Sequence, residues 1–200
     1  MKFNRGITVL ALAAVGVAFT LTAAAQSTTT TDPTVAQRKE NQQDRIANGV
    51  QNGSLTPGET ANLESKEAGL NEETRDMRAA DDGHLTAADK AKLNQQQNKL
   101  SNNISKDTHN AATDHFGSGE VGQRKENQQD RIASGIQNGS LRPGEARNLE
   151  SKETALNGET RDMRKLNNGK LTTADKKIVN HQQNRLSRNI YRDKHNGRHS

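Results

Sequence analysis

The chain of 200 residues contains no cysteine, one tyrosine and three phenylalanines, and only 29% of its residues are hydrophobic. Without cysteine it has neither a disulfide framework nor a cysteine for lipid attachment. Outside the first 25 residues the only aromatic side chains are Phe116 and Tyr191. Single-stranded nucleic acids usually bind through bases stacked on aromatic rings. We therefore expect no site that depends on aromatic stacking.

The first 25 residues have the pattern of a secretory signal peptide. Lys2 and Arg5 precede an apolar run over residues 7–21, and alanines occupy positions 23–25. This run is shorter than the roughly 20 residues that cross a bilayer, and a small-residue cleavage site follows it. We expect residues 1–25 to be a signal peptide that is cleaved. The rest is then a periplasmic or secreted protein without a membrane span.

The remainder of the chain is one module copied twice. Residues 37–109 recur as residues 123–195, with 50 of 73 positions identical and no gap. Polar or glycine-rich stretches flank the copies, as flexible spacers do. The sequence thus predicts two modules on a tether. The expected parts are a spacer over 26–34, helical repeat 1 over 35–110, a linker over 111–120, helical repeat 2 over 121–196 and a tail over 197–200.

A short turn pattern occurs twice in each copy. Glycine supplies a tight bend, a leucine two residues later anchors the turn, and a threonine with an acidic residue three positions on forms a capping box that begins a helix. The glycines are Gly53, Gly83, Gly139 and Gly169. In one version Arg142 replaces the threonine. We expect that helix start to be weaker by about 1 kcal/mol.

Between these turns the apolar residues recur at helical spacing, as in Leu63, Leu70 and Met77. No alternation typical of strands competes with this pattern. The expected fold class is all-α, with two tandem three-helix modules. The expected helices cover residues 35–51, 57–80, 87–110, 121–137, 143–166 and 173–196.

Each apolar stripe is narrow, so a lone copy is expected to be only marginally stable. Packing of one copy on the other, self-association or a partner could supply the missing burial. The placement of the two turns within a copy stays open. An unbroken middle helix would hold them apart, whereas a bend near Gly69 would let them pair.

The turn resembles the loop of the EF-hand, with glycine at position six, an aliphatic residue at eight and an acidic residue at twelve. Gly53, Leu55 and Glu59 match this spacing. Most other ligand positions do not: position one would be Asn48, Arg78, Ser134 or Arg164, and position three an aliphatic residue. We therefore expect degenerate EF-hand-like turns and no cofactor. If calcium does bind, the oxygen ligands would come from Asn48, Asn52, Glu59, Asp82 and Asp89.

A second resemblance covers nearly the whole chain after the signal peptide. The strings QRKENQQDRIANGVQNGSLTPGETANLESKEAGLN and NRLSRNIYRDKHN resemble a family of small secreted bacterial helical proteins of uncharacterised function. The resemblance implies export and a helical fold, and it implies no activity.

No catalytic arrangement emerges. His109 and His195 are the histidines present in both copies, and each fits a helix end, where a cation is favoured. Ser118 lies between glycines without a positioned base. His195 and His199 have the spacing of a helical metal pair, but Gly197 between them favours a frayed tail. We expect a protein that is not an enzyme and has no metal site at these residues.

Charge separates the two copies. Residues 37–109 contain 10 Lys and Arg against 12 Asp and Glu, whereas residues 123–195 contain 16 against 9. A basic surface attracts anionic polymers without sequence specificity, although mixed charges also keep helical proteins soluble. The candidate contacts for a polyanion are the cations that are new in the second copy. They are Arg142, Arg147, Lys165, Lys170, Lys177, Arg188 and Lys194.

Two functions remain. The favoured one is a non-catalytic secreted or periplasmic interaction or structural protein, whose second repeat contacts an anionic envelope polymer or another protein. The alternative is an EF-hand-like module that responds to or buffers a divalent cation.

Overall fold

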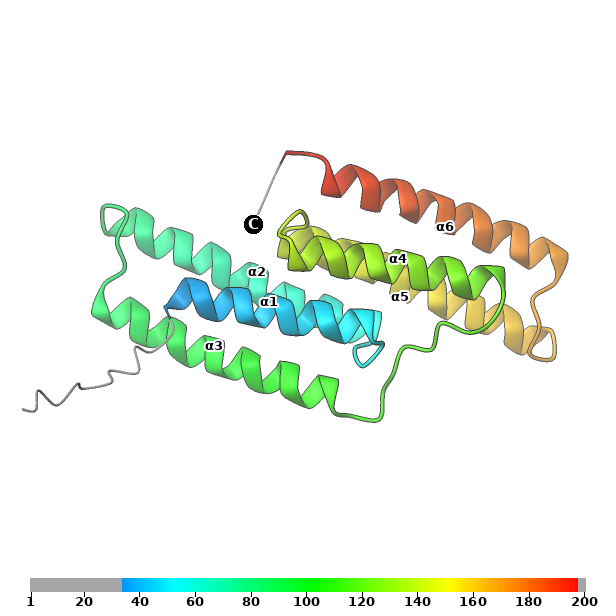
Figure 1. The fold of residues 1–200 in the computed structure, drawn as a ribbon, viewed down its shortest axis with the longest axis horizontal. Helices are drawn as coiled ribbons and strands as arrows, with labels where there is room; N and C mark the ends of the chain where they lie inside the picture. Colours follow the sequence, from blue (N-terminus) through cyan, green and yellow to red (C-terminus); the bar gives the residue numbers. More distant parts are fainter. Residues whose placement is uncertain (1–33, 198–200) are drawn as a thin grey trace, which may run out of the picture. The chain divides into compact units, whose positions relative to one another are not determined.

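The computed structural model describes residues 34–197, and throughout that range the chain is all-α (Figure 1). The predicted all-α fold class is confirmed. The six helices are α1 (Val35–Gln51), α2 (Pro57–Ala80), α3 (Ala87–Thr108), α4 (Glu120–Gln137), α5 (Pro143–Leu166) and α6 (Thr173–Lys194). They match the expected bounds, except that α3 and α6 end two residues earlier and α4 begins one residue earlier. The predicted signal peptide, the predicted spacer before Thr34 and the predicted tail after Gly197 lie outside the described residues. None of the described helices has both the length and the apolar character needed to cross a membrane.

The turns form for the reasons that the sequence indicates. All four turn glycines have positive φ, from 70° at Gly139 to 88° at Gly83, a conformation that favours glycine. Thr56, Thr86 and Thr172 each accept a hydrogen bond from the backbone of the third helical residue, whose carboxylate in turn accepts one from the threonine backbone. These reciprocal bonds satisfy N–H groups that a helix start otherwise leaves unpaired.

Two further glycines lie inside helices and explain how the turn leucines are buried. A Cβ at Gly49 would lie 2.6 Å from Leu55, and one at Gly135 would lie 2.6 Å from Leu141. The N–H of Leu55 donates to the carbonyl of Gly49 at 2.9 Å, and Leu141 does the same to Gly135. Each leucine therefore folds back onto its own preceding helix, over a position where only hydrogen fits.

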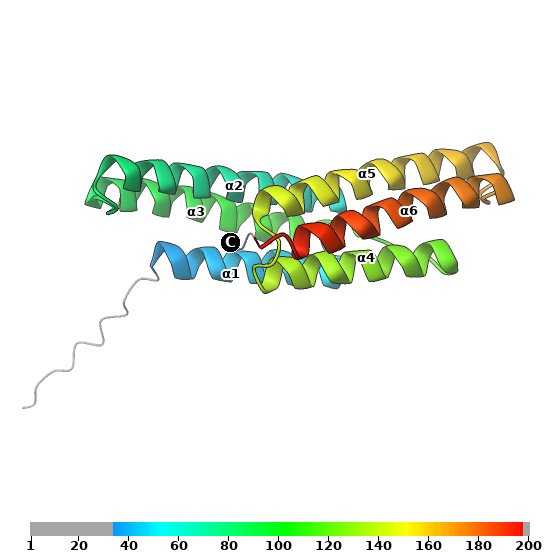
Figure 2. The same cartoon turned by 90° about the horizontal axis from the view of Figure 1, so that it is seen from above.

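The middle helix of each copy is unbroken. The helix α2 runs through Gly69, which has open space around its Cα, so the bend that would pair the two turns of a copy does not form. The α2–α3 turn and the α5–α6 turn lie at opposite ends of the compact unit formed by residues 33–200 (Figures 1 and 2).

The two copies share one core rather than forming separate modules. The strongest contacts between helices join α2 to α5 and α1 to α4, each pair made of corresponding helices from the two copies (Figure 2). The N-terminal halves of α2 and α5 run antiparallel, so that Gly58 at the start of α2 faces Thr154 of α5. The prediction of modules on a tether is not confirmed, whereas packing of one copy on the other does supply the missing burial. The shared core contains Ile46, Val50, Leu55, Leu63, Leu100 and Ile104 from the first copy and Ile132, Ile136, Leu141, Leu149, Leu186 and Ile190 from the second.

The start of α5 differs from the other capped helices. A guanidinium has no acceptor atom, so Arg142 cannot bond the N–H of Glu145 with its side chain. That N–H donates instead to the carbonyl of Arg142 at 2.9 Å. The Glu145 carboxylate still accepts from the backbone N–H of Arg142 at 3.0 Å and from its guanidinium at 3.2 Å. Half of the capping box is therefore absent and half remains.

Replacement Arg142→Thr is expected to stabilise the protein by about 0.5 to 1 kcal/mol, because it restores the missing cap and removes only a partly exposed ion pair. The reverse exchange in the first copy, Thr56→Arg, should destabilise it by a similar amount. Urea unfolding followed by circular dichroism measures both. A loss of stability in Arg142→Thr would show that the ion pair outweighs the cap.

Candidate functional site

The structure gathers only part of the predicted polyanion contacts. Lys165, Lys170 and Lys177 belong to the end of α5, the turn and the start of α6, and all three are exposed. Arg142 is the N-cap residue of α5 and Arg147 lies in its second turn, near the contact with the first copy. Arg188 and Lys194 lie on the C-terminal half of α6, and Lys194 is half-buried, with its ammonium donating to the carbonyl of Arg131 at 3.1 Å. The seven residues thus form no single patch.

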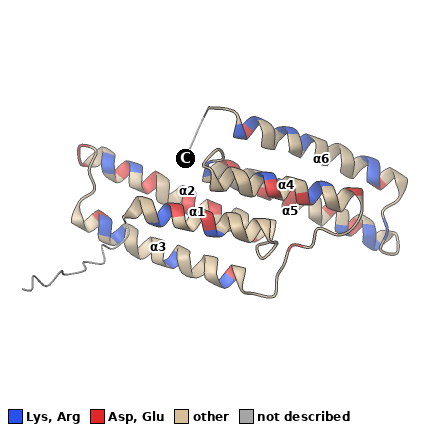
Figure 3. Ribbon diagram, viewed as in Figure 1, with Lys and Arg blue, Asp and Glu red and all other residues tan. Residues whose placement is uncertain are grey.

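We call residues 158–178 the basic turn and the corresponding residues 72–92 the acidic turn. The basic turn contains six Lys or Arg and three Asp or Glu. The acidic turn contains four Lys or Arg and six Asp or Glu. Figure 3 shows these charges at the opposite ends of the helical unit. The reversal arises from exposed positions, such as Lys165 and Lys170, whose counterparts are Ala79 and His84.

Most cations of the basic turn have no carboxylate partner among the described residues. Arg161 and Lys165 both pair with the exposed Asp162, at 3.9 and 3.5 Å. The remaining carboxylates are engaged elsewhere: Asp175 accepts from Thr172, and Glu159 accepts from Gln182. The cations without an ion pair in the described part of the chain are Arg164, Lys170, Lys176 and Lys177.

A cavity of about 350 Å³ lies beside the basic turn, and Arg164, Lys170 and Lys176 line it together with Gly119 and Glu120 at the start of α4. The start of α4 has no side-chain cap. Its N–H groups add positive potential to that of the three cations. The carboxylate of Glu120 is held by Arg124 at 3.2 Å. The positive charge of the basic turn therefore lies partly on the exposed surface, at Lys165 and Lys177, and partly around this cavity.

The residues considered as calcium ligands divide between two turns. Asn48 lies inside α1, so the first positions of the twelve-residue pattern are helical and no open loop forms. Asn52 accepts from the N–H of Ser54, and the carboxylate of Glu59 is bound by Thr56. Asp82 and Asp89 belong to the other turn of that copy, where Asp89 caps α3. The likeness to an EF-hand loop extends to the glycine and the leucine anchor, not to a ligand cage. In the described part of the chain, no group of three or more His, Cys, Asp or Glu is arranged to hold a metal ion.

The repeated histidines occupy helix ends. His109 and His195 are the C-cap residues of α3 and α6, and in each the ring Nδ1 lies within 2.7 Å of a carbonyl oxygen one turn earlier. The ring of His195 also stacks on Tyr191 at 4.2 Å between centroids. Ser118 lies on the rim of the cavity beside the basic turn. His199 lies outside the described residues.

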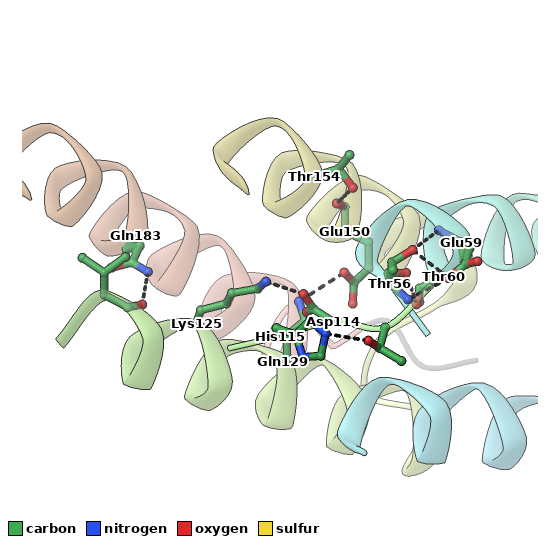
Figure 4. Close-up of polar contacts among 12 residues, drawn as sticks. Thr56, Glu59, Thr60, Asp114, His115, Lys125, Gln129, Glu150, Thr154 and Gln183 are labelled. Atoms are coloured by element: carbon green, nitrogen blue, oxygen red, sulfur yellow. Dashed lines mark hydrogen bonds and ion pairs between the residues drawn. The ribbon is translucent and has the colours of Figure 1, made fainter. Parts of the chain in front are cut away.

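Four buried glutamates were missed by the sequence reasoning. Glu64 and Glu67 lie on α2 and Glu150 and Glu153 on α5, the two helices of the antiparallel contact between the copies, and each is at most 1% exposed. Across this contact the charge of Glu64 acts on Glu150. We call these four residues the carboxylate cluster. Gln129 of α4 donates to Glu150 at 3.2 Å (Figure 4). Neither carboxyl oxygen of Glu153 accepts a hydrogen bond from a described residue.

Burial makes ionisation of this cluster unfavourable. Desolvation, together with the charge of Glu67, raises the pKa of Glu64 from 4.5 to about 8. Burial likewise raises the pKa of Glu67 to about 7 and that of Glu153 to about 7, and it raises the pKa of Glu150 well above its usual range. Nearby cations oppose these shifts. Lys39 lowers the pKa values of Glu64 and Glu67, and Lys125 lowers that of Glu153.

A signal for part of this cluster was present in the sequence. Glu67 lies four residues after Leu63 and three before Leu70, and therefore on the apolar stripe of its helix. Glu153 has the same position relative to Leu149 and Leu156. The pentapeptide LESKE is also identical in the two copies. A charged residue in phase with an apolar stripe indicates a buried carboxyl once a second helix covers that stripe.

Comparison of the chain with protein-family models, with curated proteins and with solved structures gave no match. A function therefore has to be inferred from the residues of this chain alone.

The free energy of unfolding is expected to fall as the pH rises from about 4.5 to about 8. In this window the folded protein keeps protons on the carboxylate cluster that the unfolded chain has released. Each such group therefore lowers the free energy of unfolding by about 1.4 kcal/mol per pH unit. Urea unfolding at a series of pH values measures the slope. The double replacement Glu67→Gln and Glu153→Gln should flatten it, whereas Glu72→Gln, at an exposed position, should leave it unchanged. A slope equal in all three proteins would contradict the assignment.

Calcium is expected to leave the thermal midpoint unchanged, because the carboxylates of Glu59 and Asp89 are already bound in capping boxes. Thermal melts of residues 26–200 with millimolar calcium and with a chelator compare the two conditions. A midpoint that rises with calcium concentration would demonstrate binding to the folded state.

Proposed function

We propose that the protein is a non-catalytic, secreted or periplasmic interaction protein that binds an anionic polymer of the cell envelope through its basic turn. The observation that carries the proposal is the group of four cations at this turn, Arg164, Lys170, Lys176 and Lys177, without carboxylate partners in the described residues. Unpaired cations on one surface attract phosphate- or sulfate-bearing chains by summed electrostatics and by release of counterions.

The pattern of differences between the copies supports this function. Lys165, Lys170 and Lys177 replace Ala79, His84 and Ala91 at exposed positions outside the shared core. Solubility does not require these substitutions, because mixed charges such as those of the first copy already keep a helical protein soluble. The second copy also has two carboxylates fewer at the bend itself, because Asn167 and Asn168 stand where the first copy has Asp81 and Asp82. Loss of negative charge and gain of positive charge at one turn fit a surface for an anionic partner.

The location in the proposal derives from the N-terminal residues. A charged start, an apolar run and small residues before Gln26 favour export, and the resemblance to small secreted helical proteins points the same way. An exported protein meets polyanions such as the phosphates of lipopolysaccharide, other acidic envelope polymers and extracellular DNA. A basic turn without aromatic platforms fits recognition of charge density rather than of sequence.

The test uses a short DNA duplex as a polyanion of known charge density and measures its affinity for residues 26–200 at several salt concentrations. A triple variant returns the basic turn to the residues of the first copy: Lys165→Ala, Lys170→His and Lys177→Ala. Affinity should fall at least tenfold at low salt. The slope of log affinity against log salt should fall in magnitude by about 0.9 for each phosphate that the variant no longer neutralises.

The matched control removes the same number of charges at scattered positions: Arg142→Thr, Arg147→Ala and Arg188→Asn. It should weaken binding much less. Equal losses of affinity in the two triple variants would mean that net charge alone governs binding, and absence of binding by the unmodified chain would rule out the function.

A further inference from the structure

The basic turn exposes apolar side chains as well as cations. Among the described residues, the exposed large hydrophobic side chains are Leu166, Ile178 and Tyr191. Leu166, the last residue of α5, is 85% exposed, and Ile178, in the second turn of α6, is 45% exposed. Both belong to the basic turn, whereas Tyr191 lies near the other end of α6 and stacks on His195. A chain this poor in apolar residues therefore exposes two of them at the turn that carries its unpaired cations.

The two apolar residues lie on one side of the α5–α6 hairpin. Gln182 of α6 donates to Glu159 of α5 at 2.6 Å, so these two side chains mark the side on which the helices meet. Ile178 lies four residues before Gln182, and Leu166 lies seven residues after Glu159. Both spacings return to the same helix face. Because the helices are antiparallel, both steps lead toward the turn (Figure 1). The half-buried Met163, four residues after Glu159, has the same phase.

The corresponding face of the first copy is polar. There Lys92 pairs with Glu73 at 2.6 Å. Ile178 stands where the first copy has Lys92, and Leu166 stands where it has Ala80. The exchange at Ile178 removes a cation, although the basic turn as a whole has more cations than the acidic turn. A partner that offered only negative charge would favour lysine at this position, so charge alone does not account for these two differences.

Exposed lysines adjoin both apolar residues. Lys165 directly precedes Leu166, and Lys177 directly precedes Ile178. Lys177 forms no ion pair with a described residue, and Lys165 pairs with the exposed Asp162 at 3.5 Å, a kind of pair that contributes little. A lysine side chain can lie along an apolar phase while its ammonium stays at the polar edge. The turn therefore combines apolar side chains with flexible cations around them.

We propose that the basic turn binds a layer of anionic lipids. Leu166 and Ile178 enter the apolar part of the layer, and the lysines beside them contact the headgroup phosphates. The inference rests on the proposed function in its use of the same turn and the same cations, and it names the partner. Binding of this kind depends on buried apolar area together with attraction to anionic headgroups. A polymer without acyl chains, such as DNA, matches only the second of these.

The place of the turn in the fold fits this mode of binding. The α5–α6 turn lies at one end of the helical unit, away from the contact between the copies (Figures 1 and 3). Leu166 and Ile178 are not part of the shared core. The turn can therefore meet a flat surface, and its apolar residues can enter it, without any opening of the core.

The first test measures co-sedimentation of residues 26–200 with lipid vesicles. Vesicles of phosphatidylcholine with about one-third phosphatidylglycerol supply an anionic surface, and vesicles of phosphatidylcholine alone are the uncharged control. We expect binding to the anionic vesicles only, and its loss at high salt. The double replacement Leu166→Ala and Ile178→Gln should weaken vesicle binding at least tenfold and leave the affinity for DNA unchanged. Tyr191→Gln, which removes an exposed apolar side chain outside the basic turn, should leave both unchanged.

The second test reports insertion directly. The chain contains no tryptophan, so Leu166→Trp introduces a single fluorescent reporter at the turn. Its emission should shift to shorter wavelength with anionic vesicles, and lipids brominated in their acyl chains should quench it. Ala80→Trp, at the corresponding position of the acidic turn, should show neither change.

Equal vesicle binding by the unmodified chain and by the Leu166→Ala, Ile178→Gln variant would overturn the inference, as would an unshifted reporter at position 166. Binding to DNA without binding to vesicles would overturn the lipid surface alone and leave the proposed function intact. Vesicle binding that needs Leu166 and Ile178, without binding to DNA, would contradict the polymer function and support the lipid surface. Absence of binding to both would overturn both proposals.

Discussion

The antiparallel contact between α2 and α5 is the constraint on which the rest of the structure depends. It joins the copies into one unit and buries Glu64, Glu67, Glu150 and Glu153 among the apolar residues that hold them together. An ionised carboxyl in such a place costs several kcal/mol unless it is paired. The chain avoids most of this cost by keeping the groups protonated and by placing Lys39 and Lys125 nearby. A sequence this poor in apolar residues thus completes its core with side chains that are neutral only while buried.

Local chemistry made the helices and turns predictable. The glycine, the leucine and the threonine of each turn act within a few residues of one another, so Gly53, Leu55 and Thr56 define a helix start without help from distant parts of the chain. Arg142 shows the same principle, because the missing acceptor could be read from the residue type alone. Helix bounds were accurate where such caps occur. The largest differences lie at the ends of α3 and α6, where no glycine terminates the helix.

Features that depend on a second helix could not be predicted in the same way. The repeat shows that the copies are alike, but not that α2 packs on α5. Without that contact Glu67 reads as one of many surface charges, although it lies in phase with Leu63 and Leu70. The linker was misjudged for a similar reason. Its composition is that of a spacer, yet Asp114 is fixed by Lys125 and by the backbone of Gly53, neither of which adjoins it in sequence. Likewise, the seven cations chosen by residue type separate in space, because residue type does not indicate which helix surfaces meet.

Duplication also explains why the fold can carry two different surfaces. The LESKE segments at the central contact are identical in the copies, so substitution there would affect both halves of one core. The turns at the ends lie outside this core, and Lys165, Lys170 and Lys177 replace Ala79, His84 and Ala91 without altering any buried contact.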